Sequence, residues 1–104
     1  MFNRRRFKDS GIILHLNSTL TSNNIWVVNL NKKWEPYDEL SIVNMNDDND
    51  ILAEISSDSF AVPKGSQRQI TQLINNLSIK NIGTTTITAE DIRIEIRHTG
   101  RVFR

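Results

Sequence analysis

The chain has 104 residues, a formal net charge of +1, no cysteine, 38% hydrophobic residues and 24% charged residues. This length fits one compact domain, and the absence of cysteine excludes disulfides, thiolate metal ligands and a thiol nucleophile. No run of apolar residues is long enough for a membrane-spanning helix, and the N-terminus lacks the hydrophobic stretch of a signal peptide. A soluble protein without an export signal is expected.

The amino-acid usage predicts strands rather than helices. The chain holds fourteen isoleucines and eight threonines against three alanines. Side chains branched at Cβ lose rotamer freedom in helices and pack well on pleated sheets. Twelve asparagines lie mostly between the apolar runs, where their short amides favour turns. We therefore expect an all-β protein.

The chain opens with a basic segment. Residues 1–8 contain four basic residues and no acid, and they precede the first apolar run. We interpret residues 1–10 as a basic N-terminal arm and residues 11–104 as a single β-sandwich domain. The arm residues expected to contact a partner are Arg4, Arg5, Arg6, Phe7 and Lys8.

Short apolar runs separated by turn-forming residues then follow one another every 10 to 15 residues. The clearest is 92–97, where three isoleucines alternate with Arg93, Glu95 and Arg97, as in a strand with one solvated face. The others are 12–16, 25–30, 40–45, 51–55, 77–80 and one more at 59–62 or 67–73.

About seven strands and their turn signals predict an antiparallel β-sandwich of Ig-like or jelly-roll type. The runs 77–80 and 92–97 are expected to pair as consecutive antiparallel strands. Residues 67–77 could instead form a short helix, because four apolar residues fall at helical spacing: Ile70, Leu73, Ile74 and Leu77.

The large aromatic residues divide into two groups. Trp26 lies in the middle of a predicted strand and is expected in the core. Trp34 and Tyr37 flank a proline near a predicted strand end, which is typical of contact surfaces because rigid rings offer area at low entropic cost. We consider both for partner binding, and packing at the edge of the core is the alternative.

Charge is segregated along the chain. Residues 35–58 hold eight acidic residues and no base, whereas residues 1–8 and the C-terminal stretch are basic. Complementary patches steer association between copies of a protein, so a homo-oligomer is expected. The alternative is that both segments are merely solvated. The acidic middle of the chain argues against nucleic acid as the partner.

Residues 46–50 alternate oxygen-bearing side chains in the manner of a calcium loop. The sixth position, however, is Ile51 and the twelfth is Ser57, where an EF-hand requires Gly and Glu. A polar turn explains the same residues, and a weak ion site near Asp48, formed with other loops or another subunit, stays open.

No catalytic constellation is found. His15 and His98 are isolated in the sequence, and no nucleophile elbow, P-loop, dinucleotide fingerprint or zinc motif occurs. The adjacent carboxylates at 38–39 and 90–91 are attributed to turns. No catalytic, cofactor-binding or metal-binding residue is therefore predicted, and no cofactor is expected.

Three segments, 37–44, 60–66 and 77–87, resemble small β-sandwich proteins of phage and virus particles. These proteins tend to carry a strand ending in Asn, a Val-Pro-x-Gly turn and an I-x-N-x-G-T-T-x-I hairpin. Similar hairpins also occur in Ig-like modules of archaeal surface filaments and adhesins. Since such proteins share architecture without a common site, no functional residue is transferred.

The resemblance implies a non-enzymatic structural subunit of a virion, such as a capsid decoration, collar or tail accessory protein. Such a subunit would form a symmetric homo-oligomer and dock on neighbouring virion proteins. The alternative is an Ig-like binding module that recognises glycan or a cell surface through Trp34, Tyr37 and the loops around Asp48.

Overall fold

A computed structural model describes residues 10–30, 37–56 and 58–99 of the chain. This part of the protein is all-β, without a helix, and so contains none that could cross a membrane. Its strands are β1 (Ser10–His15), β2 (Ile25–Val27), β3 (Tyr37–Asn44), β4 (Ile51–Ile55), β5 (Asp58–Val62), β6 (Ser66–Ile74), β7 (Leu77–Asn81) and β8 (Ile92–His98).

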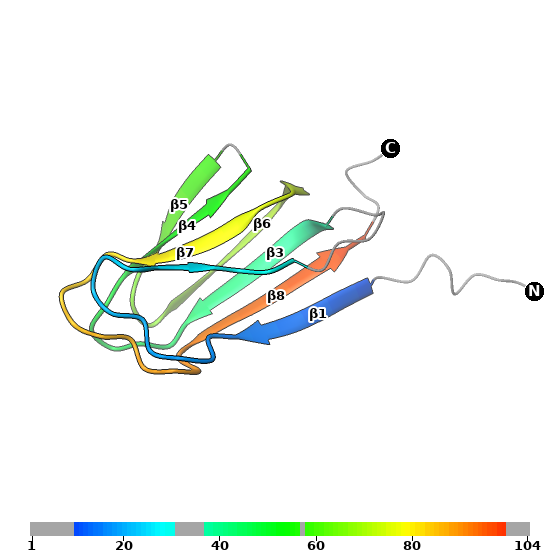
Figure 1. Ribbon diagram of the computed structural model, residues 1–104. Helices are drawn as coiled ribbons and strands as arrows, with labels where there is room; N and C mark the ends of the chain where they lie inside the picture. The colour runs from blue at the N-terminus through cyan, green and yellow to red at the C-terminus, as the bar shows by residue number, and fades with distance from the viewer. Residues whose placement is uncertain (1–9, 31–36, 57, 100–104) are drawn as a thin grey trace, which may run out of the picture.

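The strands form two antiparallel four-stranded sheets with the orders β1-β8-β3-β6 and β2-β7-β4-β5 (Figure 1). The first strand therefore shares a sheet with the last, the second with the seventh, the third with the sixth and the fourth with the fifth. This is the arrangement that a long antiparallel hairpin gives when it folds over into two sheets. This is the jelly-roll arrangement of the two predicted alternatives. An Ig fold would instead place the first two strands side by side in one sheet, whereas here they lie in different sheets.

The core lies between the two sheets and is built by alternation. In β8, Ile92, Ile94 and Ile96 are fully buried, and the charged residues between them face outward. In β4, Ile51, Ala53 and Ile55 are buried in the same way from the opposite sheet. Trp26 packs against this core, as predicted.

One end of the sandwich gathers the loops that join β1 to β2, β3 to β4, β5 to β6 and β7 to β8 (left in Figure 1). We call it the loop end. Leu20 and Ile87, from two of these loops, form an isolated antiparallel bridge, and both side chains are buried. The loop end is thus closed by apolar packing and main-chain hydrogen bonds.

Two expectations from the sequence are corrected, and one alternative is excluded. Both 58–62 and 66–74 are strands, which raises the number to eight, because Pro63 to Gly65 is a turn between two strands and not an interruption of one. The helix considered within 67–77 does not form, since β6 pairs along β3. β7 and β8 are not neighbours, because the connection between them crosses from one sheet to the other.

Candidate interaction surfaces

Most residues expected to bind a partner lie outside the described residues: Arg4, Arg5, Arg6, Phe7, Lys8 and Trp34. Tyr37 is the exception. It opens β3 with 9% of its surface exposed and belongs to the core cluster. Its ring therefore packs in the core, as the alternative interpretation held.

The second end of the sandwich is where the described chain begins and ends. Ser10 pairs with His98 there, and β3 begins there at Tyr37. Residues 1–9, 31–36 and 100–104 all join the described chain at this end, which we call the terminal end. Their ionisable side chains are mainly basic: Arg4, Arg5, Arg6, Lys8, Lys32, Lys33, Arg101 and Arg104 against Asp9 and Glu35.

The loop end carries the opposite charge. Asp47, Asp48 and Asp50 are exposed in the β3–β4 loop, and Glu90 is exposed in the β7–β8 loop. Lys64 is the one basic residue of the loops at this end, all of which are described, and its backbone N–H donates to Asp50 Oδ1 at 2.8 Å. The loops of the loop end are therefore acidic, and two further exposed acids, Glu54 and Asp58, lie near the β4–β5 turn at the terminal end.

A network of buried asparagines holds the loops of the loop end together by hydrogen bonds. Asn44 and Asn49 are fully buried and Asn46 nearly so. Asn44 Nδ2 donates to the carbonyl oxygens of Asn49 at 2.9 Å and Val62 at 3.1 Å, which ties the β3–β4 loop to β5. Asn46 Oδ1 accepts the N–H groups of Asp48 and Asn49, and the Asn46 amide donates to Asp91 Oδ2 at 2.9 Å.

Asn81 plays the same part for the β7–β8 loop. Its amide donates to the carbonyl oxygens of Leu20 and Thr85, and its Oδ1 accepts the N–H of Gly83 at 2.8 Å. Sequence reasoning assigned the asparagines to turns and missed this network. The alternation of side chains along the strand could have revealed that Asn81 is buried, because it follows the inward-facing Leu77 and Ile79 at every second position.

This network accounts for the alternating oxygens of 46–50. Asn46 Oδ1 is already used by protein N–H donors, including Asn49 Nδ2 at 2.8 Å. Asp47, Asp48 and Asp50 face solvent around it. Among the described residues no group of three or more His, Cys, Asp or Glu side chains could hold a metal ion. The polar turn therefore explains this segment.

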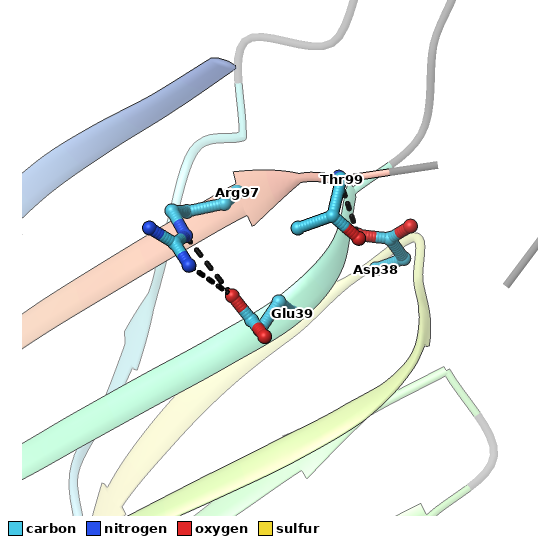
Figure 2. A network of polar contacts seen from close by, with 4 residues as sticks. All are labelled: Asp38, Glu39, Arg97 and Thr99. Atoms are coloured by element: carbon cyan, nitrogen blue, oxygen red, sulfur yellow. Dashed lines mark hydrogen bonds and ion pairs between the residues drawn. The ribbon is translucent and has the colours of Figure 1, made fainter. Parts of the chain in front are cut away.

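At the terminal end, two adjacent carboxylates of β3 bind different partners (Figure 2). Asp38 is fully buried and accepts hydrogen bonds from the backbone N–H and the hydroxyl of Thr99 at 2.8 and 2.9 Å. Glu39 Oε1 accepts from Arg97 Nη2 at 2.6 Å and Nε at 3.0 Å. These residues lie in a strand, where a β-bulge interrupts the register, and not in a turn as expected.

Hollows lie at the terminal end and on the outer face of one sheet. One of about 540 Å³ lies at the terminal end between β2, β4 and β7, and Glu54 is its one ionisable lining residue. Another, about 380 Å³, lies beside the β4–β5 turn, where Glu54 and Asp58 line it. A smaller one, about 140 Å³, lies on the outer face of the β1-β8-β3-β6 sheet over the small side chain of Ser41. Its rim is polar and includes Gln69 and Glu95.

Apolar side chains are exposed on three edge strands. Ile13 of β1 is 50% exposed, Leu73 of β6 is 40% exposed, and Ile25 and Val27 of β2 are 54% and 74% exposed. Each lies on the outer face of its sheet, where it adds nothing to the core. Sequence reasoning missed them because alternation does not reveal which strand lies at an edge.

Comparison with known proteins assigns no family. No protein-family model matches the chain, and no curated protein matches it in a sequence search.

Proposed function

We propose that this protein is a non-enzymatic structural or assembly protein, a virion component such as a capsid decoration, collar or tail accessory subunit. It self-associates and docks on neighbouring proteins of the particle through its basic N-terminal arm. The β-sandwich domain supplies a rigid jelly roll, and its charged segments and exposed strand edges make the contacts with other proteins.

The separation of charge along the molecule is the observation that carries the proposal. Of the six exposed acids among the described residues, Asp47, Asp48, Asp50 and Glu90 lie at the loop end, and Glu54 and Asp58 lie near the β4–β5 turn at the terminal end. The basic segments 1–8, 32–33 and 101–104 join the described chain at the terminal end. A molecule with opposite charges at its two ends attracts further copies of itself end to end, and such fields steer encounter and fix register. Nine extended residues span about 30 Å, which is enough to reach across an adjacent subunit.

The glycan-binding alternative has less support. It requires Tyr37 and the loops around Asp48 to form one surface together with Trp34. β3 separates Tyr37 from Asn44 over its whole length of eight residues, or about 23 Å at 3.3 Å per residue. Tyr37 is buried at the terminal end and Asp48 is exposed at the loop end, so the two cannot contact one glycan ring.

Light scattering tests the proposal by comparing the full chain with a chain that lacks residues 1–9. The deletion stops at Asp9 because Ser10 already pairs with His98. The full chain should show a mass well above the 12.0 kDa of one copy, and the shortened chain should show a lower mass. A particle with the mass of a single copy in both cases, without binding to proteins of a candidate particle, would overturn the proposal.

A further inference from the structure

The inference concerns the free edge of β1, and it rests on the self-association proposed above. β1 pairs with β8 along its whole length, and no described strand pairs with its other edge. Next to the strand, the N–H of Leu16 donates to the carbonyl of Ile92 at 3.0 Å. Because main-chain groups alternate in direction along a strand, Gly11, Ile13 and His15 turn their N–H and C=O groups away from β8.

The other edge strands carry features that discourage pairing with a further strand, and this includes β6, although its Leu73 is 40% exposed. On β6, Arg68 shares the inner face with its cross-strand partner Ile42 and donates to the carbonyl of Ala61 at 3.2 Å. Its guanidinium lies 5.2 Å from the centre of the Phe60 ring of β5. The positive charge of Arg68 on the inner face therefore attaches β6 to β5 and discourages the addition of another strand. On β5 the protecting features are the charge of Asp58 at its start and Pro63 directly after its end. β2 is protected by its short length of three residues.

β1 has none of these features. Its six residues include no proline, lysine, arginine or acid, and Ile13 exposes half of its surface on the outer face. Flat apolar edges without such protection are the ones that accept another strand. Unpaired main-chain donors and acceptors specify the chemistry of the partner, which must be an extended strand.

We propose that β1 pairs antiparallel with β1 of a second copy, centred on Ile13, so that two β1-β8-β3-β6 sheets continue as one. In this register Ile13 lies directly opposite the partner's Ile13, which covers both exposed side chains. Gly11, without a side chain, lies opposite the partner's His15, and Ile12 opposite the partner's Leu14. The outward-facing main-chain groups of Gly11, Ile13 and His15 then all find hydrogen-bond partners, and the two-fold symmetry closes the interface.

Disulfide trapping tests this register, because the full chain contains no cysteine. Cross-strand partners in a hydrogen-bonded pair have Cα atoms about 5.5 Å apart, which lies within disulfide range. Ile13→Cys should therefore form a covalent dimer under mild oxidation. Ile25→Cys is the matched control, because it places the same residue, with nearly equal exposure, on an edge strand of the other sheet. It should remain uncrosslinked.

A second pair of variants measures affinity in the full chain. Ile13→Lys places like charges opposite each other and should weaken dimerisation roughly tenfold or more, whereas Ile25→Lys should not. Circular dichroism of both variants checks that the fold is retained. If the full chain self-associates but neither Ile13 variant differs from its Ile25 control, the β1 interface is wrong and the proposed function stands. If every chain is a monomer, both fail.

Discussion

Gly83 shows how tightly single residues are fixed at the loop end. A Cβ built on Gly83 would overlap Asn49 Oδ1 and lie 2.7 Å from Asn49 Cβ. Asn49 cannot move away easily, since it is fully buried and bonded to Asn46 and Thr85. Gly83→Ala should therefore lower the free energy of unfolding by about 1–3 kcal/mol, as overpacking does. Urea denaturation measures the loss.

A double-mutant cycle gives the control for this prediction. In an Asn49→Ala background the obstructing amide is gone, so Gly83→Ala should cost much less than in the native chain. Equal costs in the two backgrounds would show that contact with Asn49 is not the reason for glycine at this position.

At the scale of elements, the two carboxylates of β3 should contribute unequally to holding the end of β8. Asp38 is fully buried and accepts two hydrogen bonds from Thr99, whereas the Arg97 side chain that binds Glu39 is 38% exposed. Asp38→Ala should lower the free energy of unfolding by about 2–3 kcal/mol, because hydrogen bonds to a buried charge are lost. Glu39→Gln should cost about 1 kcal/mol or less, because solvent screens the pair.

Urea denaturation of both variants, together with hydrogen exchange at the Thr99 amide, checks this order. Exchange at that amide should accelerate strongly in Asp38→Ala and little in Glu39→Gln. Equal losses of stability would contradict the expectation that Asp38 contributes more than Glu39 to holding the end of β8.

The elements also show what could be foreseen from the sequence. Alternation located most of the strands and named the buried face of β8, because side-chain period depends only on local geometry. Alternation could not assign strands to sheets, because the two-residue period of a strand does not show which other strands pair with it. The predicted pairing of β7 with β8 was therefore wrong. At β3 the bulge between Tyr37 and Glu39 breaks the alternation, which hid the burial of both Asp38 and Glu39.

The candidate surfaces were foreseen in part for the same reason. Charge segregation is visible in the sequence, but the gathering of Asp47, Asp48, Asp50 and Glu90 at one end follows from the jelly-roll topology, which returns the chain to the terminal end at Thr99. The exposed edge of β1 depends on strand order as well. The uneven distribution of charge could therefore be predicted from the sequence, whereas the edge position of β1, which depends on the arrangement of strands, could not.

At the scale of the whole molecule, the two proposed contacts differ in symmetry. Pairing through β1 is two-fold and stops at a dimer, whereas a basic arm that docks on the acidic loop end of another copy does not close upon itself. Together they would link dimers into larger assemblies, and only the second contact depends on charge. Its strength should fall with salt, because the screening length shortens from about 30 Å at 0.01 M to about 8 Å at 0.15 M.

Light scattering across this salt range should show the full chain falling from a large mass toward that of a dimer, and the chain without residues 1–9 should stay a dimer at both salts. Replacing Asp47 and Asp48 by Asn should reduce the large assembly in low salt, because both carboxylates are exposed at the loop end. Glu54→Gln removes one exposed acid from the outer face of β4 and should leave the assembly unchanged. A mass that does not depend on salt, or equal effects of the two sets of substitutions, would show that the loop end does not receive the arm.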